Sequence, residues 1–327
     1  MIGVTQMDIS KGAKIIIGDW LNIKDGEKLL IITDGTHINE AGSLRDEAEK
    51  LGALVVTIIV PENSTHNGYI FEDMESMFVK YDAIIGATNY SLITTNTVKY
   101  AIERQSRFLS LPLSVNNDKS LLSFEFINMD TKESKEMGNK INEYLNEVDS
   151  IRITTKLGTD LSLGKCNRRA GVFNGQALNP GDVSSSSFEV YIGVEENKTQ
   201  GKAILDGSFG YLGVIEENTK LVFEDGKLIE IQETPSGKIL KEYMDSFEDE
   251  RIYTVGELGI GLNKLSRCNG NCYIEDESAY GTFHLGMGRN IALGGIQDAK
   301  GHFDLVFHNP DIYAGETLII KDGKIII

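Results

Sequence analysis

Apolar and polar positions follow two different patterns along this chain. In the first half, continuous apolar runs alternate with stretches of helical composition. The runs lie at residues 28–34, 53–60, 82–89 and 107–113, and the helical stretches at 39–52, 69–81, 92–105 and 130–149. A β-branched run such as 53–60 is typical of a strand buried on both faces. The alternation predicts a parallel sheet that is covered by helices.

From residue 150 onward the pattern changes to short strands with glycine-rich turns. Residues 150–164 alternate around a Gly-Thr-Asp turn, which predicts a hairpin. Two Asp-Gly-Lys turns, at 225–227 and 322–324, indicate further antiparallel pairs, and one helix is expected near 237–247. We therefore expect an α/β domain with a parallel sheet over residues 1–148, followed by a strand-rich α+β domain over residues 149–327.

Composition narrows the classes of partner. The chain has 327 residues and a formal net charge of −17, which argues against nucleic acid or an anionic membrane as partner, because both attract basic surfaces. No apolar run approaches the length of a membrane span, and the N-terminal segment lacks the core of a signal peptide. A cytoplasmic location is the resulting expectation.

Two local features are interpreted as structural. The three cysteines, Cys166, Cys268 and Cys272, are an odd number in a long chain and do not resemble a secreted disulfide framework. The turn at residues 34–37 ends a predicted strand, where α/β sheets often bind ligands, but it is interpreted as an ordinary loop. No G-x-G-x-x-G motif follows a predicted strand of the first half, and no G-x-x-x-x-G-K-(S/T) motif occurs, so the parallel sheet has no visible phosphate-binding loop.

Candidate chemistry is concentrated between residues 257 and 304. This segment holds two of the five histidines, and His302 and Asp304 are separated by one residue. On a strand both side chains would point to the same face, so both could reach one ion. Imidazole together with carboxylate suits Zn, Co, Mn or Fe(II). A surface histidine beside an aspartate is the alternative for this pair alone.

Several motifs follow one another in the second half of the chain. They are RITTKLGTDL (152–161), FEVYIGVEENKTQG (188–201), VFEDGKL (222–228), GELGIGLN (256–263), EDESAYGTFHLGMG (275–288), GHFD (301–304) and the C-terminal IIKDGKI. In this order they resemble the aminopeptidase T/aminopeptidase S family of metallopeptidases. The resemblance implies an aminopeptidase T-like fold and a metallo-aminopeptidase, a hydrolase that removes N-terminal residues from peptides. It also implies a homodimer.

By position, the resemblance implies two divalent ions, Zn, Co or Mn, that activate a water molecule. The implied ligands are Glu189, Glu257, His284, His302 and Asp304. Glu277 is interpreted either as a residue that orients a metal ligand or as an exposed turn carboxylate, and it is also a weak candidate for the general base.

Two positions depart from the peptidase pattern. Ile291 stands where peptidases of this family carry a tyrosine of the metal site, and neither Tyr280 nor Tyr313 can be assigned in its place. Arg289 adds a positive charge close to the expected cations.

Two other functions remain open. The scaffold also resembles 2,5-dihydroxypyridine dioxygenases, which hold one Fe(II) with two histidines and one aspartate. His302 and Asp304 could supply two of these ligands, but the remaining histidine would occupy the position of Glu257. The acidic residue there favours the peptidase hypothesis. The third possibility is a non-catalytic relative that binds a metal ion or a small molecule.

Overall fold

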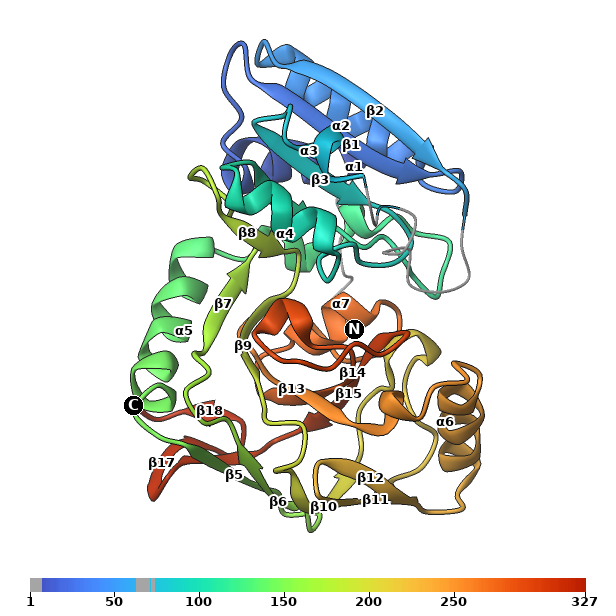
Figure 1. The fold of residues 1–327 in the computed structure, drawn as a ribbon, viewed down its shortest axis with the longest axis vertical. Helices are drawn as coiled ribbons and strands as arrows, with labels where there is room; N and C mark the ends of the chain where they lie inside the picture. Colours follow the sequence, from blue (N-terminus) through green and yellow to red (C-terminus); the bar gives the residue numbers. More distant parts are fainter. Residues whose placement is uncertain (1–7, 63–70, 72–73) are drawn as a thin grey trace. The chain divides into compact units, whose positions relative to one another are not determined.

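The structure is a computed structural model that describes residues 8–62, 71 and 74–327. The chain divides into two compact units. The first comprises the chain up to Thr131 together with Phe173–Ser187, and the second comprises Lys132–Val172 together with Phe188–Ile327 (Figure 1). The chain thus passes from one unit to the other three times.

The first unit contains the predicted parallel sheet. Its strands are β1 (Lys28–Asp34), β2 (Leu54–Val60), β3 (Ala83–Ala87), β4 (Arg107–Ser110) and β8 (Val183–Ser185), in the order β2-β1-β3-β4-β8. All neighbouring pairs are parallel. The four apolar runs of the first half therefore form strands as predicted, whereas β8 comes from a later, serine-rich segment.

Helices flank these strands in the chain. They are α1 (Ile9–Ile15), a π-helical turn (Ile16–Trp20), α2 (Ile38–Lys50), α3 (Glu75–Phe78), α4 (Asn96–Glu103) and two 3₁₀ turns (Leu121–Ser123 and Glu125–Asn128). Gly52, with φ +88°, follows the end of α2, as the sequence predicts for a helix stop. The helix predicted at 69–81 lies partly outside the described residues, and among those that are described only Glu75–Phe78 form an α-helix, α3.

The second unit is built mainly from antiparallel strands. An eight-stranded sheet has the order β12-β11-β10-β6-β5-β16-β17-β18, and a five-stranded sheet has the order β15-β14-β13-β9-β7. The strands of the first are β5 (Ser150–Thr154), β6 (Asp160–Gly164), β10 (Gln200–Leu205), β11 (Thr219–Glu224), β12 (Lys227–Ile231), β16 (Asp311–Ala314), β17 (Thr317–Lys321) and β18 (Lys324–Ile325). Those of the second are β7 (Gly171–Asn174), β9 (Phe188–Gly193), β13 (Val255–Gly261), β14 (Thr282–Gly288) and β15 (His302–His308).

Local turn chemistry explains the hairpins. β5 and β6 pair across the predicted turn, and both Asp-Gly-Lys turns join antiparallel strands. Asp225 and Gly226 have φ of 47° and 80°, the left-handed values that a tight hairpin turn requires at both central positions. The helix expected near 237–247 is α6 (Pro235–Asp245), capped by Thr234, whose hydroxyl accepts the N–H of Gly237. The remaining helices are α5 (Thr131–Leu145), α7 (Tyr273–Ser278) and the 3₁₀ turns Gly210–Leu212, Glu250–Tyr253 and Ile291–Leu293.

The main core of the second unit contains one face of each sheet. From the five-stranded sheet it includes Val190, Ile192, Leu258, Ile260, Phe283, Leu285, Phe303 and Leu305, and from the other Ile151, Ile153, Leu161 and Leu163. Because side chains alternate along a strand, the residues between these apolar positions point to the opposite face of the five-stranded sheet. Helix α7 contacts β9, β13, β14 and β15. Within the described part of the chain, no helix is long and apolar enough to cross a membrane.

Candidate metal centre

The face of the five-stranded sheet that points away from the core carries the polar residues predicted from the sequence. Its side chains are Glu189 and Tyr191 on β9, Glu257 on β13, His284 on β14, and His302 and Asp304 on β15. Every one of these positions alternates with a buried apolar residue of the core. The period of two therefore sorts core and candidate site onto opposite faces of the same strands.

Glycines on neighbouring strands make room for these side chains. Gly259 is paired with His284, and a Cβ at Gly259 would lie 1.9 Å from Nε2 of the imidazole. Gly286 is paired with Glu257, and a Cβ there would lie 2.7 Å from Cε1 of His302. A larger residue at either position would displace a candidate ligand, so the glycine-rich sequence of β13 and β14 has a steric reason.

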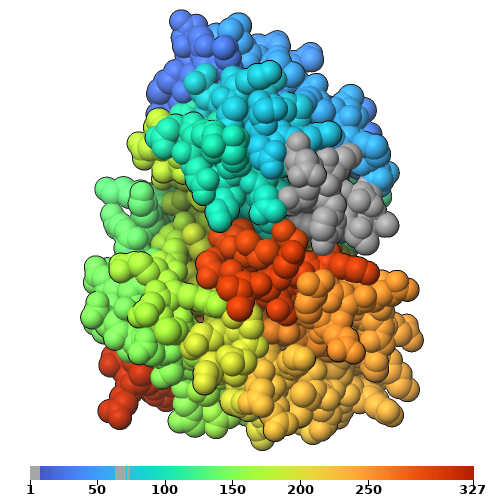
Figure 2. Space-filling view, in the orientation of Figure 1, coloured from blue at the N-terminus to red at the C-terminus, as the bar shows by residue number. Residues whose placement is uncertain are grey.

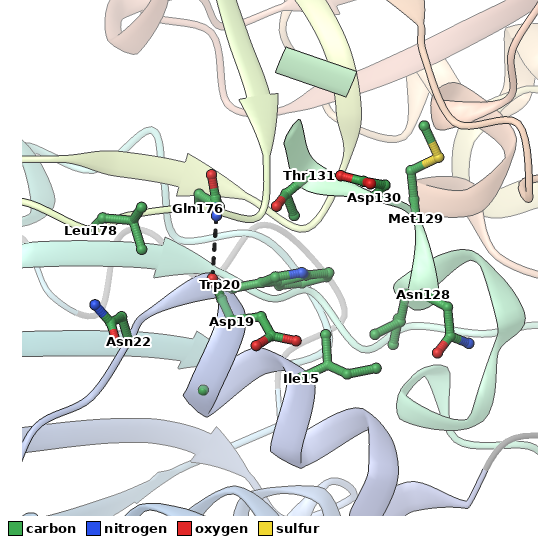
Figure 3. Close-up of a pocket in the computed structure, with 12 residues that line it drawn as sticks. Ile15, Asp19, Trp20, Asn22, Asn128, Met129, Asp130, Thr131, Gln176 and Leu178 are labelled. Atoms are coloured by element: carbon green, nitrogen blue, oxygen red, sulfur yellow. Dashed lines mark hydrogen bonds between the residues drawn. The ribbon is translucent and has the colours of Figure 1, made fainter. Parts of the chain in front are cut away.

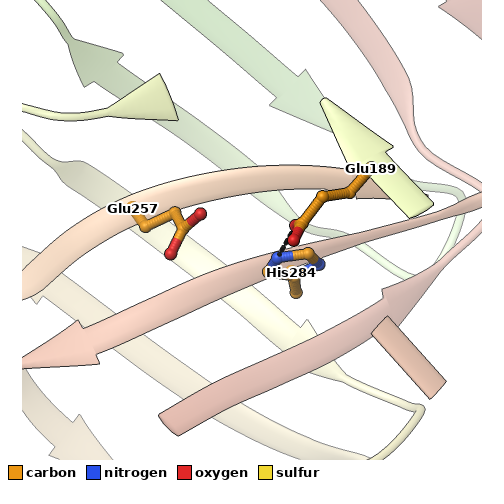
Figure 4. Close-up of side chains that lie close together, drawn as sticks. All are labelled: Glu189, Glu257 and His284. Atoms are coloured by element: carbon orange, nitrogen blue, oxygen red, sulfur yellow. Dashed lines mark ion pairs between the residues drawn. The ribbon is translucent and has the colours of Figure 1, made fainter. Parts of the chain in front are cut away.

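The structure brings the five expected ligands into two overlapping groups. Glu257, His302 and Asp304 each offer one ligand atom within 4.8 Å of the others, and so do Glu189, Glu257 and His284. Figure 4 shows the second group, in which Nε2 of His284 lies 2.8 Å from Oε2 of Glu189. In the first group Nε2 of His302 lies 3.2 Å from Oε2 of Glu257. Glu257 belongs to both groups and connects them.

His302 is held in the orientation that a metal ligand needs. Its Nδ1 lies 2.8 Å from the backbone carbonyl oxygen of Arg289. A carbonyl can only accept, so Nδ1 carries the proton and donates this hydrogen bond. Nε2 is then the basic nitrogen, and it faces Glu257 and Asp304.

The carboxylates create a strongly negative environment inside the protein. Burial raises the pKa of Glu257 above its ordinary value, although His302 opposes this change. Burial acts against a charged imidazole at His284, yet the adjacent Glu189 raises the pKa of His284 to about 9. Buried carboxylates that face one another require positive charge nearby, either as protons on the imidazoles or as a cation.

One carboxylate oxygen of the first group, Oδ1 of Asp304, could accept a further hydrogen bond or bind a cation. Oδ1 of Asp304 lies 3.4 Å from Nε2 of His302, which is long for a hydrogen bond, and it is buried without a hydrogen-bond partner among the described residues. A divalent ion that prefers mixed nitrogen and oxygen ligands would satisfy this oxygen. The residues of this face therefore fit a metal ion.

Helix α7 adds a further carboxyl group. Glu277 is 5% exposed, so it is not an exposed turn carboxylate, and its carboxyl is hydrogen-bonded to Asp304. Burial first, and then the charge of Asp304, raise the pKa of Glu277 well above its ordinary value. The pKa of Asp304 moves the other way: burial would raise it, but the adjacent His302, and then the hydrogen bond with Glu277, lower it.

Three tyrosines beside the two groups were not identified from the sequence. Burial, with smaller contributions from Glu257 and Glu189, raises the pKa of Tyr191 to about 12. The rings of Tyr211 and Tyr273 pack with centroids 4.2 Å apart, and burial raises both of their pKa values. Tyr191 could have been found from its position two residues after Glu189. Tyr211 had no comparable signal.

The structure shows where the residues that depart from the peptidase pattern lie. The guanidinium of Arg289 forms an ion pair with Asp298. Arg289 contacts the site through its backbone carbonyl, which accepts the hydrogen bond from His302. Ile291 lies in the 3₁₀ turn after β14. The hydroxyl of Tyr280 accepts a backbone N–H of β18, and Tyr313 lies on β16 in the other sheet. Neither tyrosine belongs to the two groups.

The first unit contains a separate pocket of about 660 Å³. Figure 3 shows its lining, in which the side-chain amide of Gln176 donates to the backbone carbonyl of Asp19. The carboxylates of Asp19 and Asp130 are the acidic groups in this lining. Among the described residues, both groups that could hold a metal ion lie in the second unit.

The family model and the curated relative that match this chain carry the same description. A family model described as 2,5-dihydroxypyridine 5,6-dioxygenase matches residues 20–327. The curated 2,5-dihydroxypyridine 5,6-dioxygenase of Pseudomonas putida is 24% identical over 196 residues, 56% of this chain and 55% of the relative. The chain thus matches about half the length of that relative.

Two solved structures share the fold. The 2,5-dihydroxypyridine dioxygenase from Pseudomonas putida has a TM-score of 0.82 at 17% identity and covers 97% of this chain and 96% of its own. Wild-type AmpT from Thermus thermophilus has a TM-score of 0.65 at 15% identity, with 98% and 99% covered. Both likenesses concern the fold alone.

These findings correct the assignment made from the sequence. The resemblance to the aminopeptidase T/aminopeptidase S family, and with it the expected hydrolase, protease and metallo-aminopeptidase activity, is wrong, because the family match covers nearly the whole chain and names a dioxygenase. The error has a physical cause: the quoted motifs describe strands, turns and glycines of a scaffold that both kinds of protein share. The chain belongs to the 2,5-dihydroxypyridine 5,6-dioxygenase family.

Proposed function

We propose that this protein is a metal-dependent dioxygenase that opens the ring of a hydroxylated pyridine or a closely similar small aromatic compound. The family match and the shared fold support this proposal. The observation that carries it is the convergence of Glu257, His302 and Asp304, which offer ligand atoms within 4.8 Å of one another on a buried face. The substrate is then a small molecule, in place of the peptide expected from the sequence.

The first group would hold the metal ion, which we propose to be Fe(II). When bound, iron supplies the redox chemistry that dioxygen needs to react with an aromatic ring. The usual Fe(II) triad combines two imidazoles with one carboxylate, whereas Glu257, His302 and Asp304 combine one imidazole with two carboxylates. The second imidazole, His284, is connected to this group through Glu257. Zn, Co and Mn suit the same donors, so the identity of the ion requires direct comparison.

The residues around the ligands have defined tasks. The carbonyl of Arg289 orients the ring of His302, and the carboxyl of Glu277, hydrogen-bonded to Asp304, orients the carboxylate of Asp304. The ring of the buried Tyr273 packs against the partly buried ring of Tyr211, and together they help to keep bulk water away from these carboxyl groups. Ligands fixed in this way are poised before a substrate arrives, which lowers the cost of reorganisation.

The test combines metal analysis with oxygen consumption. Protein purified without chelators is analysed for metal, and metal-free protein is reconstituted anaerobically with Fe(II), Mn(II), Co(II) or Zn(II). We expect 2,5-dihydroxypyridine to cause oxygen uptake with the Fe(II) form, in proportion to the substrate consumed. His302→Ala should lose both metal and uptake. His37→Ala, which changes a histidine of the first unit, is the matched control and should retain both.

Binding of one equivalent of Fe(II) without oxygen uptake, for 2,5-dihydroxypyridine and for the monohydroxypyridines, would refute this proposal. Such a result would support a relative that binds a metal ion without this chemistry. The homodimer expected from the sequence remains a prediction, which light scattering on the same preparations would measure.

A further inference from the structure

A buried asparagine organises the loop between β14 and β15. Asn290 has no exposed surface, and its side chain uses its hydrogen-bonding groups within the protein. Nδ2 donates to Oε1 of Glu196 at 2.9 Å and to the carbonyl of Gly256 at 3.1 Å. Oδ1 accepts the backbone N–H of Gln297 at 2.9 Å. A buried amide satisfied on both ends is rigid, because every rotation would break a hydrogen bond.

These contacts place Asn290 between two backbone segments, each of which positions one candidate ligand. Gly256, which accepts from Asn290, immediately precedes Glu257 on β13. Arg289, which immediately precedes Asn290, provides the carbonyl that accepts the hydrogen bond from Nδ1 of His302. One side chain thus connects the backbone next to Glu257 with the backbone that orients His302.

Glu196 fixes Asn290 from the other side. Its Oε1 also accepts the backbone N–H of Ile296 at 2.9 Å, so it contacts the loop at two places. The guanidinium of Arg168 contacts both of its oxygens, at 2.8 and 3.0 Å. The side chains of Glu196 and Arg168 are 16% and 17% exposed, and hydrogen bonds between ionised partners are stronger than those between neutral groups.

The loop needs such an anchor because its tip gains little from packing. Ile296 is 83% exposed, and the region around the loop reaches the surface in the view of Figure 2, where it is orange-red. Close to Asn290 the packing is tight, since a Cβ at Gly295 would lie 2.1 Å from its Oδ1. The loop is therefore held at its base, on the side of the candidate ligands.

We propose that Asn290, held by Glu196, is a positioning residue that sets the spacing of Glu257 and His302 for the metal ion. The inference rests on the proposed metal centre, but it is independent of the reaction that the metal serves. Partners that orient a metal ligand without touching the ion typically contribute about 10–100-fold to metal affinity. We expect Asn290→Asp to weaken metal binding by that factor, because a carboxylate would replace the two N–H donors and face the acceptors of Glu196 and Gly256.

The experiment measures metal affinity separately from stability. Metal-free full-length protein is titrated with Mn(II) and Zn(II) in competition with a chelator, the visible spectrum of the Co(II) form is recorded, and thermal unfolding is followed for each metal-free variant. Asn290→Asp and Glu196→Gln should both weaken affinity, the second by about 10-fold, and both should change the Co(II) spectrum. Asp298→Asn is the control on the same loop: it removes the ion pair with Arg289, leaves the carbonyl in place, and should change neither.

Unchanged metal affinity in Asn290→Asp and Glu196→Gln would overturn the inference, even if both variants melt earlier, because the network would then serve stability alone. If Asn290→Asp does not fold, the metal affinity of Glu196→Gln alone decides: an unchanged affinity would overturn the inference, and a weakened one would support it. Wild-type protein that binds metal tightly but consumes no oxygen would remove the proposed function and leave this inference standing.

Discussion

Two of the places where the molecule buries carboxylates treat them differently. In the first unit, Asp34 is fully buried at the end of β1, and its oxygens accept the N–H of Asn89 at 2.6 Å and the N–H and hydroxyl of Thr36 at 3.1 and 2.6 Å. The charge is stabilised by donors of the protein itself. Asp34 thereby ties the ends of two strands together and leaves little capacity for a ligand.

In the second unit, buried carboxylates face imidazoles and one another. Glu257 lies among His302, Glu189 and Asp304, and its pKa is raised mainly by burial. The imidazoles supply only part of the positive charge that these groups need. A buried acid surrounded by backbone N–H groups indicates structure, whereas buried acids that share imidazoles indicate a place for a cation.

The largest expected effect is on metal affinity, and it should distinguish His302 of the second unit from His37 of the first. His302→Ala should weaken Mn(II) binding by more than about 100-fold, since even partners outside the ligand set contribute about 10–100-fold. His37→Ala, beside Asn89 in the first unit, should leave affinity unchanged. Calorimetric titration measures both. Equal affinities for the two variants would remove the distinction between the regions.

The next effect tests the space that glycine leaves for the ligands. Gly259→Ala should lower the free energy of unfolding by about 3 kcal/mol, at the upper end for an overpacked core, because the new Cβ would meet Nε2 of His284 at 1.9 Å. Gly42→Ala is the control on α2, where no atom lies within 4 Å of the new Cβ. Urea denaturation measures both variants. A tolerated Gly259→Ala would mean that the ring of His284 can leave its position freely.

A smaller effect is expected at the aspartate of the first unit. Asp34→Asn should lower the free energy of unfolding by about 2 kcal/mol, because it weakens hydrogen bonds to a charged acceptor. Metal affinity should not change. A loss of metal binding in this variant, measured by the same titration, would contradict the structural role given to Asp34.

The smallest effect is a pH dependence that originates at Glu196. Burial alone would raise the pKa of Glu196, but Arg168 and the hydrogen bonds from Ile296 and Asn290 lower it to about 2. The unfolded chain has a value of about 4.3, so this stabilisation is complete above that pH and is lost as the pH falls toward 2. Melting temperatures between pH 6 and pH 3 should therefore fall less steeply for Glu196→Gln than for the wild type. Parallel curves would contradict the lowered pKa.

Local patterns predicted much of the fold correctly. The apolar runs of the first half form the parallel sheet, and the Asp-Gly turns close hairpins, because strand burial and turn geometry depend on neighbouring residues. The one-residue spacing of His302 and Asp304 predicted their shared face for the same reason. The contribution of Glu277 was harder to predict, since its position beside Asp304 depends on how α7 packs on the sheet.

The choice of family shows where local patterns fail. The quoted motifs fit a scaffold that both the dioxygenase and AmpT share at low sequence identity. The residue at position 257 then favoured the peptidase hypothesis, although the family match over residues 20–327 indicates a dioxygenase. A match over nearly the whole chain is therefore stronger evidence for the family than the residue type at one ligand position.

The sequence by itself determined the strands, their turns and the alternation that separates apolar from polar side chains, because these depend on contacts between near neighbours. The spacing of His302 and Asp304 also placed these two side chains together, but only the tertiary structure decided that Glu189, Glu257 and His284 join them. It also decided that Asn290 and Glu196 hold the loop beside them. Such meetings depend on strand register and loop packing between segments far apart in the chain, and no local pattern encodes them.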